Sequence, residues 1–316
     1  MVKPELKAKL EKQQYRFSGE HSAVKICNWT KNSLKDQGVC YKEVFYGIKS
    51  HRCCQITPTV GFCQNRCIFC WREIELGEGK CEVAVSETNT KLDQPEEIVE
   101  NSIKMHRKLL EGFWGNDKVN KKKLKEAWEP NQFAISLTGE PTLYPHLNDI
   151  IRILKEKGNS TFVVSNGLRP DVIRSIEAPT QLYVSLDAPD EQTFLKVDRP
   201  GVMDAWNKLM ETFDALREHR LKGKGRTAIR VTLIKGLNMH DPIKYAGLIE
   251  RAQPTVVEVK GYMHVGASRQ RMNKEHMPKH KEVREFAKEI AKHCPYTFTD
   301  EQESSFVVLL TRDHVE

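Results

Sequence analysis

Short apolar segments alternate with longer amphipathic segments along most of the chain. The apolar segments predict strands near 55–57 and at 133–137, 161–164, 182–186, 227–234, 256–259 and 306–310. The amphipathic segments predict helices at 4–14, 94–114, 145–157, 170–176, 190–220, 242–251 and 279–292. Strands that alternate with helices form a parallel sheet, so the pattern predicts an α/β protein.

The number of strand–helix repeats predicts a barrel. About six βα units are available, which suits a partial (βα)6 TIM-like barrel. Polar residues follow nearly every strand, and this favours a barrel over a doubly wound open sheet, because barrel active sites form at the carboxyl ends of the strands. We expect an N-terminal extension over 1–54, the core barrel over 55–285, and a C-terminal helix and strand over 286–316.

The composition is that of a globular protein with a polar surface, with 39% hydrophobic and 29% charged residues. The sequence contains no apolar run that could cross a bilayer and no signal peptide, so we expect a cytoplasmic protein without a membrane partner. Nine cysteines in such a protein indicate metal or redox roles rather than a disulfide framework. The net charge of +7 is compatible with a polyanionic partner.

Cys63, Cys67 and Cys70 form a C-x3-C-x2-C motif, and Trp71 follows it. Three thiolates at this spacing can hold one cubic iron–sulfur cluster and leave one iron for a substrate or cofactor. The alternatives are a zinc site or buried structural cysteines. Structural zinc prefers four ligands in paired spacing, and no matching pair lies nearby in the sequence, so the motif favours a reactive [4Fe–4S] cluster.

Cys27, Cys40 and Cys53 form a second triplet, with C-x12-C-x12-C spacing, upstream of the first. We interpret it as the ligand set of a second three-cysteine cluster. The alternatives are a cysteine-rich structural segment, or a zinc site that takes Cys54 or His51 as its fourth ligand.

Polar residues that follow the predicted strands are candidate cofactor contacts. A glycine permits close backbone approach to a ligand, a glutamate can bind a cationic amino group, and hydroxyl and amide groups suit a ribose or carboxylate. Several of these stretches are also ordinary turn sequences, and their shared place after strands is what favours a binding site. The candidates are Gly139, Glu140, Ser165, Asn166, Ser185, Asp187 and Asn238.

The C-x3-C-x2-C motif, the aromatic residue after it and the Gly-Glu-Pro element at 139–141 resemble the radical S-adenosylmethionine superfamily. The upstream triplet, Lys42 after its second cysteine, and the Thr-Leu-Ile-Lys-Gly-Leu-Asn stretch at 232–238 resemble the archaeal tRNA 4-demethylwyosine synthases within it. The resemblance extends from about Tyr15 to the C-terminal helix, and it implies a barrel of the radical S-adenosylmethionine type.

The resemblance implies a lyase of wyosine biosynthesis that uses S-adenosyl-L-methionine and two [4Fe–4S] clusters. The expected substrate is tRNA(Phe) with N1-methylguanosine at position 37, and pyruvate is expected to supply two carbons that close the tricyclic base. The two cysteine triplets would hold the clusters. Lys42, with Lys49 as its rival, would form a Schiff base with pyruvate. Cys54 departs from the pattern, since either it or Cys53 could be a ligand.

The same resemblance bears on partners. The chain has no room for the flavodoxin-like domain of eukaryotic relatives, so we expect a monomer served by an external electron donor of the flavodoxin or ferredoxin type. Basic stretches at 121–123, 217–226 and 268–271 are candidate contacts to tRNA phosphates, although such runs are also typical of a solvated surface. Aromatic candidates for stacking on a splayed base are Phe45, Tyr46, Trp71 and Tyr262.

Two other functions remain open on sequence grounds. One is another radical enzyme that modifies RNA, such as a methyltransferase or methylthiotransferase. The other is a zinc-dependent RNA-binding module without catalytic activity.

Overall fold

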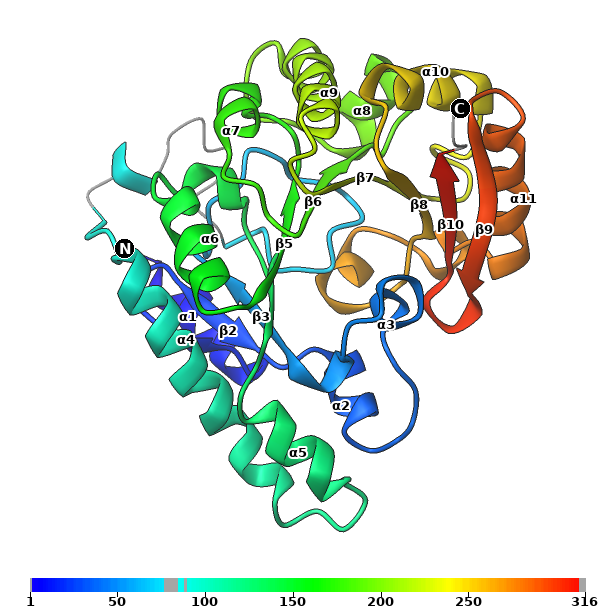
Figure 1. The fold of residues 1–316 in the computed structure, drawn as a ribbon. Coiled ribbons are helices and arrows are strands. Elements are labelled where there is room, and N and C mark those ends of the chain that lie inside the picture. Colours follow the sequence, from blue (N-terminus) through cyan, green and yellow to red (C-terminus); the bar gives the residue numbers. More distant parts are fainter. Residues whose placement is uncertain (1, 77–84, 88–89, 313–316) are drawn as a thin grey trace. The chain divides into compact units, whose positions relative to one another are not determined.

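The computed structural model describes residues 2–76, 85–87 and 90–312 (Figure 1). The chain forms two compact units. The first unit consists of Met1–Cys63 and Glu75–Val164, and the second of Gln64–Ile74 and Ser165–Glu316. The second unit therefore includes the loop that directly follows Cys63.

The strands of the first unit pair in chain order. They are β1 (Arg16–Phe17), β2 (Ala23–Lys25), β3 (Cys53–Thr57), β4 (Gln132–Ile135) and β5 (Ser160–Ser165). β1–β2 and β2–β3 are antiparallel, whereas β3–β4 and β4–β5 are parallel. In the parallel register, Cys54 lies opposite Phe133 and Phe133 lies opposite Thr161. These parallel strands confirm the predictions near 55–57, at 133–137 and at 161–164.

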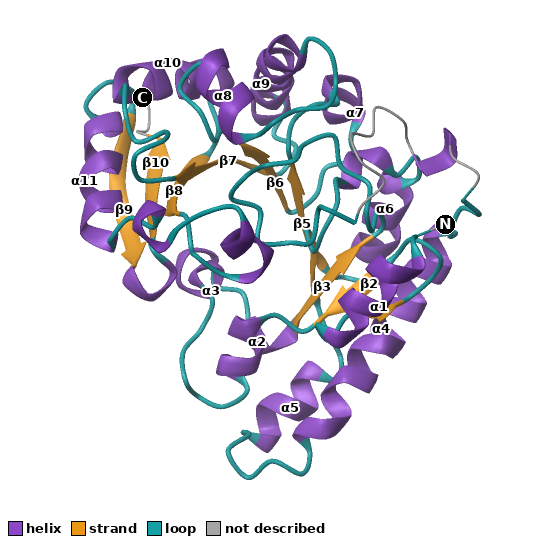
Figure 2. Cartoon of the chain, turned by 180° about the vertical axis from the view of Figure 1, so that it is seen from behind, coloured by secondary structure: helices purple, strands orange, loops and turns teal. Residues whose placement is uncertain are grey.

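Helix α4 covers the antiparallel end of these strands. It packs against β1, β2, β3 and α6 (Figure 2). Its buried residues recur every three or four positions, at 95, 98, 99, 102, 106 and 110, and this spacing places them on one face of the helix. The helices of this unit are α1 (Pro4–Lys12), α2 (Asn28–Ser33), α3 (Tyr41–Tyr46), α4 (Pro95–Leu110), α5 (Lys121–Ala127) and α6 (Leu147–Glu156), with one-turn helices η1 (Ser50–Arg52), η2 (Val85–Glu87), η3 (Glu111–Phe113) and η4 (Pro141–Leu143).

The basic stretch around residues 121–125, which the hydrophobic pattern did not predict to be helical, forms α5. Asn120 caps this helix, because its side chain accepts hydrogen bonds from the backbone N–H groups of Lys122 and Lys123. Leu124 and Ala127 are fully buried and anchor the helix.

The second unit continues with parallel strands and ends in an antiparallel hairpin. Its strands are β6 (Gln181–Ser185), β7 (Arg226–Leu233), β8 (Val256–Gly261), β9 (Tyr296–Gln302) and β10 (Val307–Arg312). β6–β7 and β7–β8 are parallel, which confirms the predicted strands at 182–186, 227–234 and 256–259. β10 lies beside β8 but runs antiparallel to it, so the expected parallel direction is wrong for the last strand. The reason is β9, which returns through the one-turn helix η7 (Glu303–Ser305) and pairs antiparallel with β10.

Helices α7, α9, α10 and α11 pack in that order along the strands of the second unit (Figure 1). The helices here are α7 (Pro170–Ser175), α8 (Glu191–Val197), α9 (Ala205–Leu221), α10 (Pro242–Ala252) and α11 (His280–Ala291), with one-turn helices η5 (Gly266–Gln270) and η6 (Lys274–His276). The single long helix predicted at 190–220 is wrong, because residues 198–204 separate α8 from α9. Pro200 lies in this break, where it lacks an N–H and disfavours a helical residue before it.

Across residues 2–76, 85–87 and 90–312, none of the helices has both the length and the apolar character needed to span a bilayer.

Candidate functional site

The upstream cysteines are carried by three short segments of the first unit. Cys27 caps α2, since its sulfur accepts a hydrogen bond from Thr30 N at 3.3 Å. Cys40 directly precedes α3, and Cys53 begins β3. All three thiols are half-buried.

These thiols lie close enough to influence one another electrostatically. Burial raises the pKa of the Cys53 thiol, Cys27 raises it further, Lys42 lowers it and Cys40 raises it. The structure therefore brings together the three predicted ligands and the lysine that follows the second of them. Metal binding needs the thiolate, so loading this site has to release a proton from Cys53.

The two candidate lysines have different surroundings. Lys42 is half-buried, and its Nζ lies 4.5 Å from the ring centroid of Phe162 on β5. The Lys49 side chain is 58% exposed, and its Nζ lies 3.9 Å from Glu126 Oε2. Desolvation lowers the pKa of a lysine and makes it a better nucleophile, and the exposed Lys49 lacks this, so the surroundings favour Lys42.

Cys54 lies in the core. It is fully buried, and burial followed by the neighbouring Cys53 raises the pKa of its thiol. Successive residues of a strand point to opposite faces, so Cys54 points away from the face that Cys53 presents. This placement favours Cys53 over Cys54 as a ligand.

The segment after β4 folds against the residues that lead to Cys63. Glu140 N donates to Phe62 O at 2.8 Å. Gly139 has a φ of +73°, and a Cβ at this position would lie 1.9 Å from Thr59 O, so the turn requires glycine. The buried Glu140 carboxylate accepts hydrogen bonds from the N–H and hydroxyl of Thr142, which fix its orientation.

In the second unit, the loop Gln64–Ile74 is bonded to the segment between α8 and α9. Ile68 N donates to Val197 O at 2.9 Å and Arg66 N to Asp198 O at 3.0 Å. Asn65 and Pro200 form an antiparallel bridge. The break in the predicted helix at 190–220 therefore places backbone groups against the loop that carries Cys67 and Cys70.

Arg271 holds the same loop from the other side. Its Nε donates to Ile68 O at 3.2 Å, and its Nη2 donates to Cys70 O. Nearby, Gly266 has a φ of +59°, and a Cβ there would lie 2.3 Å from Trp71 O. Arg271 belongs to a stretch that we interpreted as a contact to tRNA phosphates, and its guanidinium binds the backbone of the loop Gln64–Ile74, called the cluster loop below.

Cys67 and Cys70 lie one turn apart, since Cys70 N donates to Cys67 O at 3.1 Å. The Cys67 thiol donates to Asp198 Oδ1 at 3.3 Å. Burial raises the pKa of Asp198 well above its ordinary value, with a further increase from Asp187. Burial also raises the pKa of Asp187 to about 6, against hydrogen bonds from Thr232. Asp198 was not among the sequence candidates, because it lies in a predicted helix rather than after a strand.

The remaining candidates for cofactor contact differ in the hydrogen bonds that their side chains make within the protein. Asn166 Nδ2 donates to Gln64 Oε1 at 3.1 Å, so this side chain touches the cluster loop. Ser165 accepts a hydrogen bond from Gly167 N, and Ser185 lies half-buried at the end of β6. Asn238 is fully buried, and its amide bonds the backbone at Asp187, Thr232 and Ile234, which gives it a structural role. Cofactor contact at these positions stays a prediction.

The upstream cysteines are not arranged around one metal ion. No three His, Cys, Asp or Glu side chains among the described residues are placed to hold a single ion. In a cubic cluster, each thiolate binds its own iron. Cys27, Cys40 and Cys53 lie within electrostatic range of one another, and their use as the ligands of one cluster stays a prediction.

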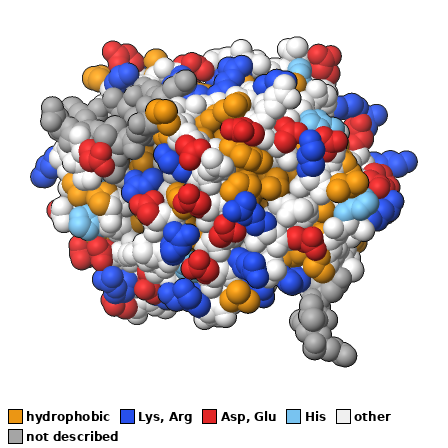
Figure 3. Space-filling model, turned by 90° about the horizontal axis from the view of Figure 1, so that it is seen from above, with side chains coloured by type: hydrophobic (Ala, Val, Ile, Leu, Met, Phe, Trp, Pro, Cys, Tyr) orange, Lys and Arg blue, Asp and Glu red, His pale blue; other side chains and the backbone are white. Residues whose placement is uncertain are grey.

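Two lysines of the basic stretch at 121–123 are bonded to other residues of the protein. Lys121 Nζ donates to Trp114 O at 2.6 Å, and Lys123 Nζ pairs with Asp36 Oδ1 at 2.6 Å. On the face shown in Figure 3, basic and acidic side chains are interspersed rather than gathered by sign. Among the aromatic candidates, Trp71 is 46% exposed, whereas Tyr262 is buried and its hydroxyl contacts Ser268.

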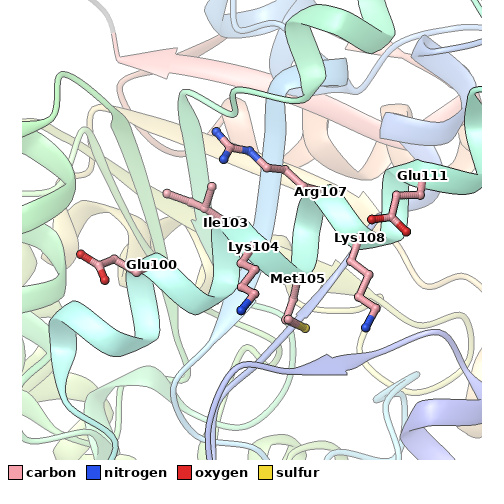
Figure 4. Close-up of a pocket in the computed structure, with 7 residues that line it drawn as sticks. All are labelled: Glu100, Ile103, Lys104, Met105, Arg107, Lys108 and Glu111. Carbon is pink, nitrogen blue, oxygen red and sulfur yellow. The ribbon is translucent and has the colours of Figure 1, made fainter.

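A surface hollow of about 420 Å³ lies on α4, between Glu100 and Glu111 (Figure 4). Its lining residues come from α4 and from the first residue of η3, with charged side chains around Met105. It contains none of the candidate site residues.

The sequence and the fold are similar to those of known proteins. The chain matches the family model of the radical SAM superfamily over residues 57–249 and that of wyosine base formation over residues 251–312. It is 48% identical to the S-adenosyl-L-methionine-dependent tRNA 4-demethylwyosine synthase of Pyrococcus abyssi, over 96% of this chain and 88% of that protein.

Two solved structures are also similar. A structure of TYW1 with a lysine–pyruvate adduct bound has a TM-score of 0.87 at 42% identity, and a crystal structure of archaeal TYW1 has a TM-score of 0.79 at 38% identity. Each alignment covers 99% of this chain and 97% of the other. The superfamily match and these likenesses confirm the predicted fold class, a partial (βα)6 TIM-like barrel of the radical S-adenosylmethionine type with short terminal extensions.

We predict that Gly139→Ala destabilises the protein much more than Gly158→Ala. Both glycines have a φ near +74°, but nothing lies within 4 Å of a Cβ at Gly158. Gly158→Ala should cost only the left-handed backbone strain of about 1–2 kcal/mol. Gly139→Ala adds a clash with Thr59 O, for roughly 3–5 kcal/mol in total. Urea denaturation of both variants measures the difference, and equal midpoints would contradict the prediction.

We also predict that Arg271→Ala loosens the cluster loop locally. A hydrogen bond from a charged donor contributes about 1.5–3 kcal/mol, so backbone amides of residues 66–71 should exchange roughly tenfold faster or more. Hydrogen–deuterium exchange with mass spectrometry measures this. The control is Arg269→Ala, which removes a single bond from an exposed arginine to His264 O. Unchanged exchange in Arg271→Ala would show that the loop does not depend on Arg271.

Proposed function

The chain belongs to the family of S-adenosyl-L-methionine-dependent tRNA 4-demethylwyosine synthases, which are radical SAM enzymes of wyosine biosynthesis, and on this premise we propose its reaction. It condenses N1-methylguanosine-37 of tRNA(Phe) with pyruvate to form 4-demethylwyosine. The reaction assigns the enzyme to the carbon–carbon lyases.

The observation that carries the proposal is the position of Lys42 beside the upstream triplet. The charges of Cys27, Cys40 and Lys42 influence the pKa of the Cys53 thiol. The lysine and the three thiols therefore lie within electrostatic range of one another. One similar structure has a lysine–pyruvate adduct bound. In our proposal Lys42 has this role in the present chain: its Nζ attacks the pyruvate carbonyl, water leaves, and the co-substrate is held as a Schiff base.

The family implies S-adenosyl-L-methionine and a [4Fe–4S] cluster, which Cys63, Cys67 and Cys70 hold in our proposal. When bound, this cluster would supply the electron that cleaves the cofactor. The cleavage would yield a radical, which takes a hydrogen atom from the methyl group of the base. A second [4Fe–4S] cluster is held by the upstream triplet. The cofactor contacts in our proposal are Gly139, Glu140, Ser165, Asn166, Ser185, Asp187 and, with the weakest support, Asn238.

The proposal extends to partners and organisation. The enzyme acts on its tRNA in the cytoplasm as a monomer and takes electrons from a separate flavodoxin- or ferredoxin-type protein. Trp71 is the aromatic side chain best suited to stack on an anticodon-loop base, because it remains exposed. The division into an extension over 1–54, a core over 55–285 and a C-terminal part over 286–316 stays part of the proposal.

Iron content and product analysis test the two-cluster reaction. Anaerobically reconstituted protein should hold about eight irons per chain, and the triple variant Cys27→Ala/Cys40→Ala/Cys53→Ala about four. The triple variant should still release 5′-deoxyadenosine but form no tricyclic base from methylated tRNA(Phe) and pyruvate, as measured by mass spectrometry. Cys294→Ala, outside both triplets, is the control and should match the wild type. About four irons in the wild type would remove the second cluster.

Borohydride trapping tests the role of Lys42. Wild-type protein incubated with pyruvate and reduced should gain the mass of one adduct. Lys42→Arg keeps the charge but cannot form a Schiff base, so it should gain no adduct and lose at least roughly 100-fold in rate. Lys49→Arg should behave as the wild type. An adduct that persists in Lys42→Arg and disappears in Lys49→Arg would transfer the role to Lys49.

A further inference from the structure

We propose that Ser50 is a positioning residue that holds the upstream cysteines and Lys42 in the arrangement that binds the second cluster. The inference rests on the proposed two-cluster reaction. Ser50 is 1% exposed and begins η1, three residues before Cys53. Nothing in the sequence distinguishes it from the other serines of the chain.

Ser50 holds the first turn of α3 at two points. Its Oγ accepts a hydrogen bond from Cys40 N at 2.9 Å, and its own N–H donates to Glu43 Oε2 at 2.8 Å. Lys42 lies between these two points of attachment. The two bonds therefore set both the ligand that precedes α3 and the lysine on its first turn.

The carbonyl of Ser50 connects the other two cysteines. It accepts a hydrogen bond from Cys53 N and another from Thr30 Oγ1, the latter at 3.0 Å. Thr30 is fully buried, and its Oγ1 lies 3.2 Å from Cys27 Sγ. One buried residue is thus bonded to the backbone of Cys40 and Cys53 and, through Thr30, to the sulfur side of Cys27.

The cysteines need these hydrogen bonds because their own segments do not hold them in fixed positions. The cysteines are separated by loops, and α2 and α3 are too short to be stable alone. A ligand set that is ordered before the metal arrives avoids that entropy cost during loading. Ser50 therefore acts on cluster retention through the positions of the cysteines, without being a ligand.

Ser50→Ala tests the inference, because it removes the acceptor for Cys40 N and leaves the backbone bonds of residue 50 in place. Reconstituted wild type and variant are exposed to an iron chelator, and iron loss and the electron paramagnetic resonance spectrum are followed. We expect the second cluster of the variant to be lost roughly tenfold faster. The first cluster should remain, so 5′-deoxyadenosine release continues. The apparent KM for pyruvate should rise more than kcat falls.

Two further variants separate positioning from general stability. Ser50→Thr keeps the hydroxyl and should restore cluster retention at least in part. Ser175→Ala, on the exposed surface of α7, should match the wild type in every measurement. Ser50→Ala protein that keeps about eight irons and loses them at the wild-type rate overturns the inference while the two-cluster reaction stands. Wild-type protein that never exceeds about four irons overturns both, because there is then no second cluster to position.

Discussion

Two cysteines of the upstream triplet directly precede short helices, and these helices depend on hydrogen bonds to other segments. α2 and α3 have six residues each, and helices of that length are unstable in water without tertiary support. The support comes from Thr30, Glu43 and Ser50, whose bonds cross from one short segment to the next. The rest of the site follows from this constraint, since Lys42 can face the thiols only if the first turn of α3 is held.

The second unit meets a similar constraint with different chemistry. The loop Gln64–Ile74 contains no helix of its own, so its backbone groups need partners from elsewhere. The break between α8 and α9 supplies backbone groups on one side, and Arg271 supplies donors on the other. Arginine suits this task because its planar guanidinium can donate to two carbonyls at once in fixed directions. A lysine ammonium can also donate to two carbonyls, but the directions of its N–H bonds are not fixed.

The sequence predicts the parts of the protein that leave a periodic or spaced pattern. β6, β7 and β8 are short segments rich in apolar and β-branched residues, and the cysteine triplets are visible from spacing alone. β9 is not visible, because most of its side chains are polar and at least partly exposed, and its order comes from pairing with β10. The roles of Ser50, Thr30 and Arg271 could not be predicted for another reason. Their side chains bond to backbone atoms, which every residue has, so the sequence does not indicate these partners.

The same bonds change how the positive charge of the chain should be interpreted. A net charge of +7 suggests ready phosphate binding, but Lys121, Lys123 and Arg271 are bound to carbonyls or to a carboxylate within the protein. Such cations contribute little to counterion release, which depends on charges that meet phosphates. These three cations are already used within the fold, so on the proposed function other contacts have to bind the tRNA. Stacking and edge contacts to one unstacked base can select that base by its structure.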